Sequence, residues 1–177
     1  LGGIVRSTSL RIAGNEFDES IIRYIRNRYN LLTGERTAED LKIKIGAAKR
    51  TPGEQDAVAE VRGRDLISGL PKSIEVTTDD VVEALKEPLE KIVQGVKGLL
   101  ETTPPELVAD IIDRGILLTG GGALLRNLDL LLQEATGVPV VVAENAVEAV
   151  ALGTGKALDM LHVLRDALVT SDNVLKR

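Results

Sequence analysis

Apolar and polar positions alternate along the chain in patterns that predict a series of short helices and strands. Residues 4–13 predict a strand, because Leu10 and Ile12 alternate with polar or small neighbours. Residues 15–30 predict an amphipathic helix, because apolar side chains recur there at every third or fourth position. The apolar face of this helix consists of Phe17, Ile21, Ile22, Ile25 and Tyr29.

The next stretch predicts a small and polar unit. A helix is expected over residues 37–48, with the Thr37 hydroxyl as its N-terminal cap and with Leu41 and Ile45 as its apolar pair. A loop with proline and glycine follows it. Two strand patterns at residues 57–63 and 70–77 then predict a hairpin.

The last hundred residues alternate between helix and strand patterns. A long helix begins at Thr78, a short one follows the proline pair at 104–105, and a final helix covers residues 146–169. Apolar runs at 115–118 and 138–142 predict buried strands. This alternation is typical of an α/β sheet that helices cover on both faces.

The two kinds of pattern predict two subdomains. Residues 1–14 and 78–177 form a large α/β subdomain, and residues 15–77 form a smaller α+β subdomain inserted into it. In this arrangement the strand at 4–13 joins the sheet of the large subdomain.

Composition excludes several classes of function. The 177 residues include no cysteine, so a disulfide, a thiolate metal site and a cysteine nucleophile are impossible. His162 is the only histidine, which excludes a multi-histidine metal site. The net charge of −5 and the aromatic content of 2% argue against nucleic acid as the main partner.

No apolar stretch approaches the roughly 20 residues of a membrane span. The start without methionine, inside an apolar run, leads us to expect an excised piece or a processed product of a longer protein.

Three consecutive glycines are the most informative local motif. Gly120, Gly121 and Gly122 follow an apolar strand and precede a helix, where free backbone N–H groups and missing side chains let a ligand approach. A tight turn without a ligand explains the same pattern equally well. The motif is not a dinucleotide fingerprint, because its third glycine would fall on Leu125.

Other candidates have simpler explanations. Glu39 and Lys42 share a helix face, where the carboxylate could accept ribose hydroxyls and the lysine stem could cover a base, but a solvated ion pair is the more common outcome. Gly155-Lys156 lacks the rest of a phosphate-binding loop, and the acidic pair Asp79-Asp80 suits a helix start. From the residues alone, the sequence contains no complete catalytic set and no metal site.

Five phrases along the chain resemble the MreB/Mbl family of bacterial actins. They are DIIDRGILLTGGGALL (110–125), ALGTGKAL (151–158), GERTAE (34–39), EVRGRD (60–65) and GLPK (69–72). They occur in the family's order over nearly the whole chain, although they do not separate MreB from Mbl.

The resemblance implies an actin-like (ribonuclease H-like) fold in which ATP and Mg²⁺ lie between two halves, of which this chain is the second. It places Gly120, Gly121, Gly122 and Ala123 beside the adenine and ribose, and Glu39 and Lys42 on the nucleoside. It also assigns the phosphate loops, the Mg²⁺-binding acids and the membrane-binding segments to the other half. We therefore expect this chain alone to bind ATP weakly at most and not to hydrolyse it, because phosphoryl transfer depends on positioned dipoles and metal around the phosphates.

For the intact protein, the resemblance implies a cytoskeletal ATPase that determines rod shape. Its filaments would lie in the cytoplasm at the inner face of the membrane, guide the cell-wall synthesis machinery and bind a RodZ-type membrane partner. The alternatives are another actin-fold ATPase, a sugar or acetate kinase half, a chaperone-type ATPase, and a docking module without enzymatic activity.

Overall fold

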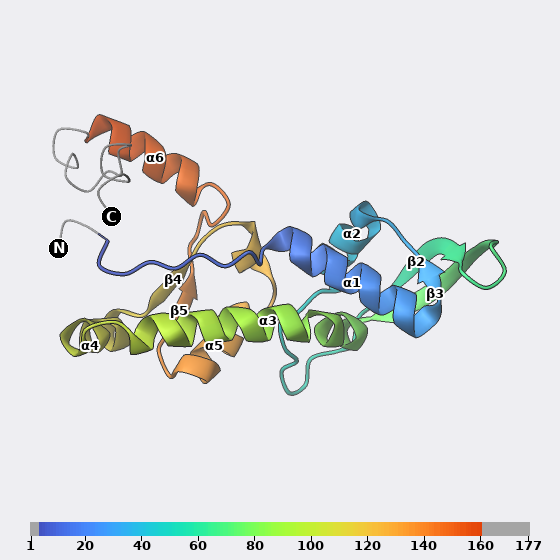
Figure 1. The fold of residues 1–177 in the computed structure, drawn as a ribbon, viewed down its shortest axis with the longest axis horizontal. Helices are drawn as coiled ribbons and strands as arrows, with labels where there is room; N and C mark the ends of the chain where they lie inside the picture. Colours follow the sequence, from blue (N-terminus) through green and yellow to red (C-terminus); the bar gives the residue numbers. More distant parts are fainter. Residues whose placement is uncertain (1–3, 161–177) are drawn as a thin grey trace.

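A computed structural model describes residues 4–160 of the chain, which fold into helices around two separate sheets (Figure 1). The helices are α1 (Gly14–Tyr29), α2 (Glu35–Ile45), α3 (Thr78–Glu101), α4 (Pro105–Arg114), α5 (Leu128–Thr136) and α6 (Ala149–Asp159), with a 3₁₀ turn η1 (Gly121–Leu124). The part of the predicted last helix beyond residue 160, with His162, lies outside the described residues. No helix within 4–160 is long and apolar enough to cross a membrane.

The first sheet is antiparallel and contains β1 (Leu31–Leu32), β2 (Val58–Asp65) and β3 (Pro71–Thr77), in that order. The pairing of Val61 with Ile74 sets the register of β2 and β3, and Val61 and Val76 point into the core. The predicted hairpin is therefore confirmed.

The second sheet pairs β4 (Ile116–Leu118) with β5 (Val140–Val142) in parallel, and both strands lie within the apolar runs that predicted strands. The expectation that both faces are covered is wrong for this sheet. Leu117 and Val141 are register partners, and their exposed fractions are 64% and 57%. Helix α5 packs on this sheet, whereas the face of Leu117 and Val141 is open in the described structure.

Residues 4–13 do not form the predicted strand. The segment instead runs extended beside α3 (Figure 1). Leu10 occupies the space above Gly95, where an added Cβ would lie 2.5 Å from Leu10 Cδ1, and Arg6 Nε donates to the Thr102 carbonyl at 3.2 Å. An alternating pattern becomes a strand only when a neighbouring backbone supplies hydrogen bonds, and here the neighbour is a helix, whose backbone groups are already paired.

The core lies where α1 and α3 pack together. Phe17, Ile21 and Ile25 of the predicted α1 stripe are at most 2% exposed, as are Val81 and Leu85 of α3. Burial of such side chains contributes about 1.5–3 kcal/mol each. Helix α2 packs on both α1 and α3, and the first sheet contacts α1 through β1 and α3 through β3. The α1–α3 pair therefore determines where the ends of α2 and of this sheet lie relative to the turn at Gly120–Ala123, hereafter the glycine turn.

Two helix caps lie one or more residues before their predicted positions. Helix α3 is capped by Thr77 rather than by Thr78, with Asp80 completing a capping box. Helix α2 begins after Gly34, so Thr37 lies inside its first turn and does not cap it. The carboxylate of Asp80 serves as a capping group, which confirms the structural interpretation of the Asp79-Asp80 pair.

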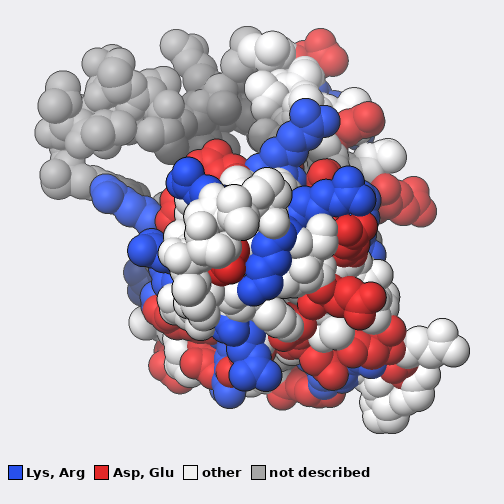
Figure 2. All heavy atoms as spheres, turned by 90° about the vertical axis from the view of Figure 1, so that its right-hand side faces the viewer, with Lys and Arg blue, Asp and Glu red and all other residues white. Residues whose placement is uncertain are grey.

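Basic and acidic side chains lie intermixed on the end of the molecule that carries the hairpin (Figure 2). Among the described residues, no group of three or more histidine or acidic side chains is placed to hold a metal ion.

Candidate functional site

A pocket of about 670 Å³ lies between the glycine turn and the helices α1 and α2. Gly121 and Gly122 line one wall, together with Leu124, Leu125 and Arg126. The opposite wall comes from the start of α1 and from one face of α2 and its C-terminal end. The volume is in the range of small-molecule sites, and the walls combine apolar side chains with a few polar groups.

The glycine turn divides the four residues that the sequence analysis selects there. Gly121 and Gly122 line the pocket, and a Cβ built on either one would meet no atom within 4 Å. Gly120 is not in the pocket lining: it turns the chain with a φ of +86°, and its N–H donates to the Ala146 carbonyl at 2.6 Å. Ala123 is buried, and its N–H donates to the Gly120 carbonyl. Gly120 and Ala123 therefore stabilise the turn, whereas Gly121 and Gly122 line the pocket.

Glu39 and Lys42 both line the pocket, on the α2 wall. Lys42 does not pair with Glu39, as an isolated helix would allow, but with Asp18 of α1, at 2.8 Å between Nζ and Oδ1. Its Nζ also donates to the Gly14 carbonyl at 3.3 Å. The ammonium is thus held at the pocket wall by α1, while Glu39 is exposed and free to accept hydrogen bonds from a ligand.

Asp18 is a site residue that the sequence analysis missed. Its side chain is 12% exposed and lines the pocket. The available signal was a carboxylate directly beside Phe17 on the buried face of an amphipathic helix, where an acid requires a partner.

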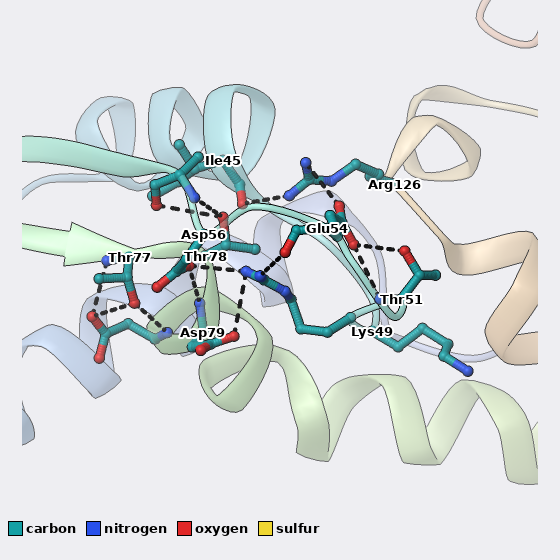
Figure 3. A network of polar contacts seen from close by, with 12 residues as sticks. Ile45, Lys49, Thr51, Glu54, Asp56, Thr77, Thr78, Asp79 and Arg126 are labelled. Atoms are coloured by element: carbon teal, nitrogen blue, oxygen red, sulfur yellow. Dashed lines mark hydrogen bonds and ion pairs between the residues drawn. The ribbon is translucent and has the colours of Figure 1, made fainter.

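Arg126 is the second missed residue, and it also lines the pocket. Its Nη1 forms an ion pair with Glu54 Oε1 at 3.0 Å, and its Nη2 donates to the Ile45 carbonyl at 3.4 Å (Figure 3). No local sequence signal predicts this contact, because Arg126 belongs to none of the motifs and its partners are distant in the chain.

The chemistry of the pocket suits a flat ring with attached hydroxyl groups. Phe17, Ile43 and Leu124 offer apolar surface, and the bare backbone at Gly121 and Gly122 allows a ring or sugar to approach closely. Glu39 supplies acceptor oxygens and Lys42 supplies donors. These residues can bind and orient a ligand.

Glu54, which pairs with Arg126 of the pocket wall, has a shifted pKa. The backbone N–H of Thr51 lowers the pKa of Glu54 below 4.5; burial opposes this change, and the Thr51 hydroxyl and Arg126 reinforce it. Glu54 is therefore a carboxylate at neutral pH, which keeps its ion pair with Arg126 intact.

The fold and the pocket define an actin-like α/β protein. The structure superposes on MreB5 of Spiroplasma citri bound to AMPPNP with a TM-score of 0.86 and 38% identity, over 91% of this chain and 48% of that one. A MamK double helical filament shares the fold, with a TM-score of 0.63 and 24% identity over 81% of this chain and 46% of that one.

The chain belongs to the MreB/Mbl family, whose model, described as MreB/Mbl protein, matches residues 1–166. It is 54% identical over 164 residues to the cell shape-determining protein Mbl of Bacillus cereus, covering 93% of this chain and 49% of that protein. It is 53% identical over 163 residues to the cell shape-determining protein MreB of Escherichia coli, covering 92% and 46%. The chain thus spans about half the length of these relatives, and the family predicted from the five phrases is confirmed.

Proposed function

We propose that this chain is the nucleoside-binding half of an ATP-binding, filament-forming protein that determines rod cell shape. The chain belongs to a family whose relatives at more than 50% identity are named cell shape-determining proteins. Its solved relative MreB5 of Spiroplasma citri was obtained bound to AMPPNP and to ADP. Filament formation is proposed from the resemblance to bacterial actins.

The observation that carries the proposal is the juxtaposition of Glu39 and Lys42 with Gly121 and Gly122 around one pocket. These residues lie about eighty positions apart in the sequence, and the resemblance selects all four as nucleoside contacts. In the proposed complex, Glu39 accepts the ribose hydroxyls, the Lys42 stem lies along the base, and the glycine backbone faces the sugar.

The proposal assigns no phosphate or metal chemistry to the described residues. Within residues 4–160 there is no acidic cluster that fits Mg²⁺, so we derive no hydrolytic step from this chain. ATP and Mg²⁺ binding of full strength, and ATP hydrolysis, are proposed for the whole protein, where Mg²⁺ and positioned dipoles would stabilise the transferring phosphoryl group.

For the whole protein we further propose a place at the cytoplasmic face of the inner membrane. There its filaments would guide the cell-wall synthesis machinery, and a RodZ-type membrane partner would bind the large subdomain of residues 1–14 and 78–177. These assignments follow from the family resemblance.

The nucleoside proposal is tested by calorimetric titration of the 177-residue chain with adenosine and, separately, with ATP and Mg²⁺. We expect weak and similar affinities for both ligands, because the proposed contacts are all to the nucleoside. Glu39→Gln should weaken both, whereas Glu35→Gln, on the same helix outside the pocket lining, should not. Absence of adenosine binding, or a submicromolar affinity for ATP alone, would contradict the proposal.

The cellular proposal is tested by exchanging the matched region of Escherichia coli MreB for this chain. We expect filaments that sediment with ATP and Mg²⁺ and cells that keep their rod shape. A chimera that accumulates as folded protein but yields round cells and no polymer would contradict the proposed role.

A further inference from the structure

The loop that joins α2 to β2 lies against the segment that follows the glycine turn. The Ala48 N–H donates to the Arg126 carbonyl at 2.7 Å, and Ala47 and Arg126 form an isolated parallel bridge. The Asn127 Nδ2 donates to the Lys49 carbonyl at 2.9 Å. The end of the α2 wall and the end of the glycine wall are thus hydrogen-bonded to each other beside the pocket.

Glu54 lies at the centre of this contact, beside Thr51 and Arg126 (Figure 3). Together with Asn127, which also contacts Glu54, these residues form the Glu54 cluster. Its Oε1 pairs with Arg126, and its Oε2 accepts from Asn127 Nδ2 at 3.2 Å and from both the backbone N–H and the hydroxyl of Thr51 at 3.1 Å. The side chain is 16% exposed. Hydrogen bonds to an ionised acceptor are roughly twice as strong as neutral ones, so this carboxylate is a strong link between the two walls.

The backbone at Asn127 and the side-chain contacts of Asn127 and Arg126 give the cluster a defined geometry. Asn127 adopts a left-handed conformation with a φ of +62°, which asparagine tolerates better than most residues. Asn127 is the N-cap residue of α5, and from there its side-chain amide donates to the Lys49 carbonyl and to Glu54 Oε2. Arg126, on the neighbouring position, bridges from the pocket wall to the Ile45 carbonyl at the end of α2.

We propose that Glu54 is a positioning residue for the pocket: it holds Arg126 and Asn127 against the α2–β2 loop and thereby sets the distance between the glycine wall and the Glu39–Lys42 wall. Glu54 is not in the pocket lining and contacts no ligand itself. The inference rests on the proposed nucleoside site for its effect on binding, but the link between the walls is independent of that site.

The test compares the 177-residue chain with its Glu54→Gln variant, which keeps the size of the side chain but loses the ion pair and presents an amide to the donors that surround it. We measure adenosine affinity by titration and amide hydrogen exchange by NMR. The variant should raise the Kd for adenosine by roughly tenfold, the effect of losing one charged hydrogen-bond partner. The Ala48 amide should exchange about tenfold faster, while the amides of Ile25 and Leu85 in the core keep their rates.

Two further variants complete the test. Glu60→Gln is the matched control, because Glu60 pairs with Arg62 on β2, exposed and away from the pocket; it should change neither quantity. Asn127→Gly keeps the left-handed backbone but removes both amide donors, so it should accelerate Ala48 exchange in the same way.

The outcomes separate this inference from the proposed function. Unchanged Ala48 exchange in Glu54→Gln overturns the positioning role whether or not adenosine binds. Unchanged adenosine affinity with faster Ala48 exchange overturns it too, because the walls would then move without effect on the pocket. Failure of the unmodified chain to bind adenosine overturns the proposed function, while the exchange data still decide whether Glu54 links the walls.

Discussion

Lys42 Nζ lies 2.8 Å from Asp18 Oδ1, and this ion pair joins α2 to α1 at the wall of the pocket. The side chains of Lys42 and Asp18 are only 16% and 12% exposed, so neither charge is well solvated. The pair therefore contributes both to the position of the ammonium and to the stability of the two helices, and it leaves Glu39 without an internal partner among the ion pairs of the described residues.

Asp18→Asn should destabilise the protein by about 2–4 kcal/mol, because it leaves the Lys42 ammonium buried without a counter-charge. The free energy of unfolding is measured by urea denaturation. Asp40→Asn, an exposed position on α2, is the control and should change this free energy by less than about 0.5 kcal/mol. Equal stability of the two variants would show that the buried pair is energetically neutral.

Two glycines of one turn should respond differently to alanine. Gly120→Ala forces a side chain into a φ of +86° and should cost about 1–3 kcal/mol of stability. Gly122→Ala meets no neighbouring atom, so it should leave stability within about 0.5 kcal/mol but weaken adenosine binding, because its methyl group occupies the pocket surface. Urea denaturation and calorimetric titration of both variants check this; adenosine binding to Gly122→Ala at full strength would argue against close approach there.

Stability at acid pH should depend on Asp80. Burial alone would raise the pKa of Asp80, but the hydrogen bonds from the Thr77 backbone and from the hydroxyls of Tyr29 and Tyr24 bring it below 3.8. A carboxyl group with a lowered pKa stabilises the folded state above its unfolded pKa, and this contribution is lost as the pH falls through the folded pKa. The stability advantage over Asp80→Asn should therefore be constant at neutral pH and shrink below pH 3.8 in urea denaturation series. A stability difference between the unmodified chain and Asp80→Asn that does not change with pH would contradict this prediction.

The hydrogen bond from Tyr24 to Asp80 should also make stability depend on alkaline pH. Burial, followed by the hydrogen bond to Asp80, raises the pKa of Tyr24 from 10.0 to about 12. Its contribution to stability is present below pH 10.0 and is lost as the pH rises through about 12. In a Tyr29→Phe background, where Tyr24 is the only tyrosine, phenolate absorbance should titrate near pH 12, and Asp80→Asn should shift the midpoint toward 10.0. A midpoint unaffected by Asp80→Asn would leave burial as the sole cause.

A leucine-to-alanine substitution should destabilise the protein much more in the core than on the open face of the β4–β5 sheet. Leu85 is fully buried, so Leu85→Ala should cost about 2–5 kcal/mol through lost burial and a cavity. Leu117 is 64% exposed, so Leu117→Ala should cost less than about 1 kcal/mol. The free energies of unfolding decide the comparison, and a large loss for Leu117→Ala would mean that this face is covered in solution.

The sequence by itself determined most of the local structure and the family. The stripe of Phe17, Ile21 and Ile25 predicted α1, the two strand patterns predicted the β2–β3 hairpin, and the apolar runs predicted the strands β4 and β5. These predictions succeeded because helices and hairpins form their hydrogen bonds between residues close in the chain, and the apolar period marks the face that is buried.

Only the tertiary structure decided which distant side chains meet. It paired Lys42 with Asp18 rather than with Glu39, placed Leu10 against Gly95 instead of in a sheet, and joined Glu54 to Arg126 across the pocket's edge. Each of these contacts depends on how α1, α2, α3 and the glycine turn pack together, and no local pattern encodes that packing. A buried charge takes the partner that the packing brings within reach, and an extended segment becomes a strand only where a free backbone edge lies beside it.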